Sequence, residues 1–195
     1  RKGDIYTHCY HGFDSTVVDS LSRQVHDAVL EAKSRGVIFD LGHGMGGFNY
    51  RVAEICIEAG LWPDAISTDM HTLTCDGPAY DMPTVMSKMI ALGMPLKDVI
   101  RASTIGPAEA IAWGDRIGTL GVGREADVTV LSFDEKEMGL EDTIGQMRKI
   151  DRLFVAEAVW RAGERGEMTR PDIFPNQVQI DKGRAAAEKA VVRDD

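Results

Sequence analysis

The sequence predicts an α/β fold in which short strands alternate with helices. Three runs of apolar, aromatic or β-branched residues occur at 4–8, 37–41 and 65–69, and amphipathic segments with helical spacing separate them. Strands and helices in this order form right-handed βαβ units and a parallel sheet. The 195 residues, 44% of them hydrophobic, can bury a sizeable core in one or two compact domains.

The first elements follow from local composition. Residues 4–8, opened by Gly3, are typical of a short strand. Apolar residues at helical spacing from Val25 to Ala32 predict a helix that ends near Gly36. Residues 37–41 are nearly all apolar, as expected for a strand that is covered on both faces.

A loop with four glycines, residues 42–47, leads from the second strand to a second helix. Asn49 can cap this helix, and Gly60 suits its end. The third strand, 65–69, follows a Trp-Pro-Asp turn. The loop contains no phosphate-binding motif, and the chain has no G-x-S-x-G, so neither nucleotide binding nor a serine nucleophile is favoured.

The second half is helical at first and then rich in strands. Asp81 and Pro83 predict the start of a helix that Gly93 closes. Two shorter helices and two strands follow; they are expected at 96–103, 107–113, 127–133 and 153–160.

A change of composition near Gly114 suggests a domain boundary. We expect a first domain at 1–114, a small β segment at 115–165 and a polar tail at 166–195. The tail is predicted to be mostly extended, with a short helix at 185–190.

The composition of the chain argues against nucleic acid and membranes as partners. Acidic residues outnumber basic ones 31 to 22, which gives a net charge of -9 and argues against nucleic acid. No apolar run approaches the roughly 18 residues of a membrane span, and no signal peptide is recognisable. The three scattered cysteines suit a reducing compartment. We therefore expect a cytoplasmic protein without a membrane or nucleic-acid partner.

Polar residues at the carboxyl ends of the predicted strands are the candidates for chemistry. His8, His43 and Asp69 each lie at or just past a strand end, which is the edge where parallel α/β folds carry their active sites. Each also has an ordinary interpretation. His8 could be a hydrogen-bonded structural histidine, His43 could lie in a tight turn that happens to expose it, and Asp69 could cap a helix. His11 and His71 are weaker candidates nearby.

Taken together, the three strand-end residues favour a metal site. Imidazole and carboxylate are the ligands that zinc uses when one position stays open for water. The flanking Gly42 and Gly44 would let the backbone come close to a ligand.

Several segments resemble the amidohydrolase superfamily of metal-dependent hydrolases, in its deacetylase and dihydroorotase-like branch. The segments that carry this resemblance lie within the first 133 residues; they are GDIYTHCY at 3–10, GVIFDLGHG at 36–44, ISTD at 66–69, STIGPAE at 103–109 and IGTLGVGREADV at 117–128.

The resemblance implies the C-terminal part of a (β/α)8 TIM barrel, about strands 6–8, plus strands of a small β domain. It implies that His8 ligates one zinc of a binuclear centre, and that Asp69 ligates the other and serves as general base and acid. The residues alone suggest three metal ligands, His8, His43 and Asp69. The resemblance instead implies that His43, with Gly42 and Gly44, contacts the substrate.

The resemblance also marks what is missing. The family's His-x-His pair, carboxylated lysine and further histidine would lie upstream of Arg1, and a full barrel needs about 250 residues. We therefore expect a fragment or a truncated product that requires the N-terminal half of the barrel. A homo-oligomer is also compatible with the sequence.

The expected activity is hydrolysis of an amide C–N bond in a small N-acyl compound through a metal-activated water. Two alternatives within the family are a dihydroorotase-like cyclic amidase and a deaminase. An alternative of another class is a non-catalytic half-barrel.

Overall fold

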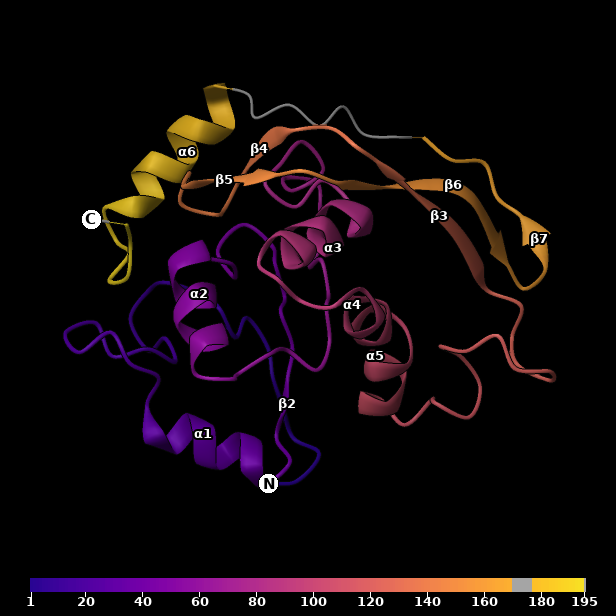
Figure 1. Ribbon diagram of the computed structural model, residues 1–195, viewed down its shortest axis with the longest axis horizontal. Helices are drawn as coiled ribbons and strands as arrows, with labels where there is room; N and C mark the ends of the chain where they lie inside the picture. The colour runs from indigo at the N-terminus through magenta and orange to yellow at the C-terminus, as the bar shows by residue number, and fades with distance from the viewer. Residues whose placement is uncertain (170–176, 195) are drawn as a thin grey trace.

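The computed structural model describes residues 1–169 and 177–194 (Figure 1). Its N-terminal part is built on two short parallel strands, β1 (Ile5–Tyr6) and β2 (Ile38–Phe39), with Ile5 opposite Ile38. Both strands lie inside the predicted runs but are shorter than those runs. The predicted parallel pairing is confirmed.

Two helices connect and follow these strands. α1 (Asp27–Ser34) lies between β1 and β2, and α2 (Tyr50–Glu58) follows the glycine loop. The predicted cap of α2 is confirmed, because Asn49 Oδ1 accepts a hydrogen bond from the backbone N–H of Val52 at 3.0 Å.

The predicted third strand is extended backbone that pairs with the second strand but forms only an isolated parallel bridge, between Asp40 and Ala65. The pairing continues beyond it: the N–H groups of Leu41 and His43 donate to the carbonyls of Ala65 and Ser67 at 2.9 and 3.1 Å. Residues 65–69 therefore occupy the position of a third parallel strand beside β2.

Three helices follow in the order that the sequence predicts. They are α3 (Met82–Ala91), α4 (Leu96–Ser103) and α5 (Ile105–Ala110). Asp81 caps α3 by accepting from the N–H of Thr84 at 2.7 Å. α5 begins two residues earlier than predicted and ends at Ala110, because Gly106 and Pro107 fit within its first turn.

The C-terminal part is antiparallel. The long strands are β3 (Val128–Asp134) and β6 (Leu153–Arg161), and β7 (Glu164–Arg165) extends their sheet. A hairpin that was not predicted, β4 (Met138–Glu141) with β5 (Met147–Ile150), lies between them in the chain. β3 and β6 run along one side of α3 and α4 (Figure 1).

Of the tail predicted at 166–195, residues 170–176 and 195 lie outside the described residues; within the described part, the predicted helix at 185–190 differs from the structure. Its helix, α6 (Gln177–Ala187), is longer and begins earlier. α6 lies beside the β4–β5 hairpin (Figure 1), where a β-carbon on Gly183 would stand 2.7 Å from the backbone nitrogen of Gly145. The domain boundaries near 114 and 165 stay predictions.

The main hydrophobic core lies between the strands and helices of the N-terminal part. Phe39, Leu41, Val52, Val85 and Met89 are among its buried residues. Cys9 and Cys56 are buried free thiols, and Cys75 is exposed. Among the described residues, no helix combines the length and apolarity that a bilayer crossing needs.

Candidate active site

The glycine loop, residues 42–47, brings the strand ends together. Gly42 and Gly44 have φ angles of +52° and +47°, a conformation that glycine adopts at little cost. A β-carbon on Gly42 would lie 2.7 Å from Nδ1 of His8, and one on Gly44 would overlap the carboxylate of Asp69. The loop therefore needs glycine both for its conformation and for the space that the two side chains occupy.

His8 lies directly against this loop. Its Nδ1 is 2.5 Å from the carbonyl oxygen of Gly42, and since a carbonyl only accepts, Nδ1 carries the proton. When the ring is neutral, its free lone pair is therefore on Nε2. This is the usual second contact of a metal-ligating histidine, which donates its other N–H to a carbonyl or carboxylate.

Asp69 lies at the other flank of the loop. Its side chain is exposed and contacts Gly44, and the described residues give its carboxylate no hydrogen bond or ion pair. Asp69 and His8 both have left-handed backbone conformations, with φ of +47° and +54°. Strained backbone at residues other than glycine is concentrated at functional sites.

The structure thus places the side chains of His8 and Asp69 against the same glycine loop. The glycines that they contact, Gly42 and Gly44, are two positions apart, and two residues span at most about 7 Å. Their roles as metal ligands and, for Asp69, as general base stay predictions.

Asp40 organises the strand ends and was missed by sequence reasoning. Its Oδ2 accepts hydrogen bonds from Thr7 at 2.6 Å and from Ser67 at 2.8 Å, which joins the segments that lead to His8 and to Asp69. Its Oδ1 is buried and has no hydrogen-bond partner among the described residues. A carboxylate at the end of an apolar strand is the signal that could have identified it.

His43 lies in a closed environment rather than at an open surface. Its ring is fully buried, stacks on Phe48 with 4.8 Å between centroids, and has Lys88 Nζ 2.9 Å from Nε2. Burial and, after it, the charge of Lys88 hold the pKa of His43 well below its usual value. Its predicted substrate contact stays a prediction, and in this structure both ring nitrogens face protein groups.

The two weaker candidates lie in local turns. His11 is half-buried, and its Nδ1 accepts from the N–H of Phe13 at 3.4 Å; burial, more than nearby His8, lowers its pKa. His71 is exposed, and its Nδ1 accepts from the N–H of Leu73 at 3.3 Å. No hydrogen bond among the described residues joins either ring to His8 or Asp69.

A complete metal site is not assembled by the described residues, in which no three His, Cys, Asp or Glu side chains gather in a ligating arrangement. His8 and Asp69 have the chemistry of two donors. A catalytic zinc ion ordinarily has three protein ligands.

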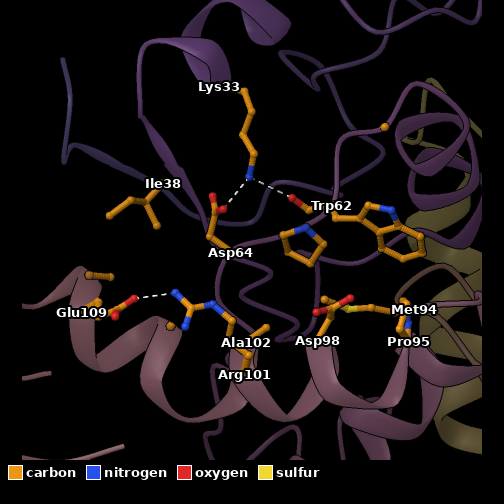
Figure 2. A pocket seen from close by; sticks show the side chains of 14 residues that line it. Lys33, Ile38, Trp62, Asp64, Met94, Pro95, Asp98, Arg101, Ala102 and Glu109 are labelled. Atoms are coloured by element: carbon orange, nitrogen blue, oxygen red, sulfur yellow. Dashed lines mark hydrogen bonds and ion pairs between the residues drawn. The ribbon is translucent and has the colours of Figure 1, made fainter.

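The pocket in Figure 2, of about 500 Å³, lies elsewhere. Ile38, at the start of β2, lines it, whereas His43 follows the end of that strand. Ion pairs flank it: Lys33 with Asp64 at 2.6 Å and Arg101 with Glu109 at 2.7 Å. Because parallel α/β folds carry their chemistry at the carboxyl ends of strands, this pocket is not part of the candidate site.

The N-terminal part is a parallel α/β unit, and its polar strand-end residues lie at the edge where such folds bind substrates. The chain belongs to the amidohydrolase family, whose model matches residues 46–166, a segment that includes Asp69.

Relatives agree with this assignment. A protein named deacetylase from Enterococcus faecalis is 35% identical over 149 residues, which are 76% of this chain and 40% of the relative. A crystal structure of an adenine deaminase matches with a TM-score of 0.83 and 31% identity over 86% of this chain and 46% of that one. A dihydroorotase structure matches with a TM-score of 0.75 and 30% identity, over 88% and 44%.

The chain therefore spans about two fifths of the length of the deacetylase that it matches. The resemblance to the amidohydrolase superfamily is confirmed, and so is the fold class: the C-terminal part of a (β/α)8 barrel with strands of a small β domain.

Proposed function

We propose that the natural protein carrying these residues hydrolyses the amide C–N bond of a small N-acyl compound. The observation that carries the proposal is the placement of His8 and Asp69 on the two flanks of one glycine loop, at the carboxyl ends of parallel strands. Membership of the amidohydrolase family and the likeness to a protein named deacetylase support the choice of reaction.

Asp69 is the proposed proton carrier. Its carboxylate is exposed and has no partner among the described residues, so it can accept the proton of the attacking water. It then delivers that proton to the leaving nitrogen, acting first as general base and then as general acid. Its contact with Gly44 sets the position of the carboxylate.

Zinc is the proposed cofactor, bound in a binuclear centre to which His8 and Asp69 each contribute a ligand. The bond from His8 Nδ1 to Gly42 leaves Nε2 free for such a role. A bound zinc ion supplies Lewis acidity and lowers the pKa of water toward about 7. The remaining ligands would come from outside the described residues, which is why we propose that the N-terminal half of the barrel is required.

Deamination is the second candidate, because the adenine deaminase structure matches with a TM-score of 0.83. Opening of a cyclic amide is supported in the same way by the dihydroorotase structure. All three reactions add water at carbon bonded to nitrogen, and their products differ.

Product analysis tests the proposal. The natural protein would be loaded with zinc, its metal content measured, and N-acetyl amino acids, cyclic amides and adenine each supplied as substrate. We expect acetate release, loss of turnover with a chelator and recovery with zinc. Ammonia or a ring-opened acid as the main product would favour one of the alternatives. Absence of both metal and turnover would favour the non-catalytic half-barrel.

A further inference from the structure

A buried lysine makes the closest polar contact to His43. Lys88, on α3, is fully buried, and its Nζ lies 2.9 Å from His43 Nε2. The same ammonium donates to the carbonyl oxygens of Pro78 at 2.7 Å and Glu141 at 2.6 Å. It thus connects α3 with the glycine loop, the segment before α3 and the end of β4.

The hydrogen bonds determine which nitrogen of His43 carries the proton. An ammonium has three N–H donors and no acceptor, so the third partner of Lys88 must present a lone pair. Nε2 of His43 is therefore unprotonated. The other nitrogen, Nδ1, faces the carbonyl oxygen of Gly44 at 3.1 Å and must donate to it. Both contacts require the same neutral Nδ1–H tautomer.

The two carbonyl acceptors and the nearby acidic side chains favour the charged form of Lys88. Burial lowers its pKa to about 8, while the nearby carboxylates of Glu141 and Asp142 oppose that shift. Tyr80 donates to Oε1 of Glu141 at 2.7 Å, and the Phe48 ring lies 5.7 Å from the ammonium. The ring of Phe48 also stacks on His43, and Lys88 is the charged group that acts on that histidine.

We propose that Lys88 is a positioning residue that locks His43 in the neutral Nδ1–H tautomer and thereby fixes the glycine loop between His8 and Asp69. In this role His43 offers no free nitrogen to a substrate or a metal ion. The assignment of the His43 tautomer does not depend on which reaction the protein catalyses. The expected effect on turnover rests on the proposed function.

Nitrogen NMR of the natural protein with ¹⁵N-labelled histidine tests the tautomer directly. His43 is assigned by the signals that disappear in His43→Asn. We expect a protonated Nδ1, an unprotonated Nε2 and no titration of this ring between pH 5.5 and 7.5, a window chosen around the ordinary histidine pKa of about 6.5. A protonated Nε2, or titration in that window, would overturn the proposal without any variant at Lys88.

Variants separate positioning from general stability. In Lys88→Met the carbonyls of Pro78 and Glu141 lose their donor, so His43 should change to the Nε2–H tautomer and donate to one of them. Lys88→Arg keeps a cation and should retain the Nδ1–H form. Lys97→Met, at an exposed lysine of α4, is the control. An unchanged tautomer in folded Lys88→Met would contradict the proposal.

Turnover provides the second readout. We expect Lys88→Met to lower kcat by about 100-fold with little change in KM, because small displacements of reacting groups have effects of that size. Partial recovery in Lys88→Arg is expected. If the tautomer is as proposed but the natural protein hydrolyses no amide, the proposed function fails and the tautomer assignment stands. If turnover is present and Lys88→Met retains it, the positioning role fails.

Discussion

Gly44 and Asp69 are packed so closely that a β-carbon on the glycine would overlap the aspartate carboxylate. The contact joins the loop after β2 to the end of the extended segment 65–69. Backbone bonds support it, since the N–H of Gly44 donates to the carbonyl of Thr68 at 2.9 Å. The position of the proposed proton carrier is therefore set by a residue that has no side chain.

Replacing Gly44 with alanine tests this contact. Both Gly44→Ala and the control Gly60→Ala place a side chain at positive φ, which costs about 1–2 kcal/mol. A β-carbon on Gly60 meets nothing within 4 Å, so only Gly44→Ala should also displace Asp69. We expect kcat to fall at least about 10-fold in Gly44→Ala alone. Equal activity of the two variants would argue against the contact.

Asp69→Asn tests the proton carrier itself. The substitution keeps the size of the side chain and removes its basicity, so kcat should fall by about 10²–10⁴-fold. Because the carboxylate is exposed and unpaired among the described residues, the free energy of unfolding should change by no more than about 0.5 kcal/mol. Asp98→Asn, at a half-buried carboxylate that lines the pocket in Figure 2, should leave turnover unchanged. Normal turnover in Asp69→Asn would remove Asp69 from the mechanism.

Asp142 should make stability depend on pH. Burial raises its pKa from 3.8 to about 6, against the hydrogen bonds from the N–H groups of Tyr50, Gln146 and Ile144. Between pH 4 and 6 the folded state therefore binds a proton that the unfolded state releases. The free energy of unfolding should fall by about 3 kcal/mol as pH rises through this window. Above pH 6 the contribution of Asp142 should no longer change.

Denaturant titrations of wild type and Asp142→Asn from pH 4 to 8 measure this contribution. The difference between the two proteins should change with pH in that window, whereas the exposed control Asp151→Asn should run parallel to wild type. Parallel curves for Asp142→Asn would show that the raised pKa is wrong.

Arg148 should stabilise the packing of the C-terminal residues. Its Nε donates to Glu54 at 2.6 Å, and its two Nη atoms donate to the carboxylate of Asp194 at 3.0 and 2.9 Å. We expect Arg148→Met to lower the free energy of unfolding by about 1 kcal/mol, less at high salt. Arg148→Lys should not restore it, because lysine cannot form the two-nitrogen contact.

The matched control is Arg101→Met, whose ion pair with Glu109 is more exposed and should contribute less. Salt titration of the unfolding transition distinguishes the two positions. A larger effect at Arg101 would contradict the expected importance of the Arg148 contacts.

The order of strands and helices in the first half was predictable because each segment carries its own signal. Asn49 and Asp81 are caps that local sequence identifies, and the apolar run 37–41 identifies a strand. The β4–β5 hairpin was missed because each of its strands has only four residues, too few for a clear period-two pattern. Its turn at Gly145, with φ of +81°, was the signal available.

The candidate site was predictable only as strand-end positions. His8 and Asp69 could be placed at an edge, but their contacts with Gly42 and Gly44 depend on the tight loop geometry. The contact between Lys88 and His43 joins residues 45 positions apart, and lysine is rarely fully buried. Nothing local distinguishes this lysine from an ordinary surface residue of a helix.

The hairpin tip has a consequence for how the chain folds during synthesis. Asp142 Oδ2 accepts from the N–H of Tyr50 at 3.0 Å, and Thr143 donates to the carbonyl of Phe48 at 2.6 Å. The first turn of α2 is thus completed from more than 90 residues downstream. A ribosome must release the hairpin before that turn finds its final partners, so the native arrangement around the glycine loop forms only after the hairpin has been synthesised.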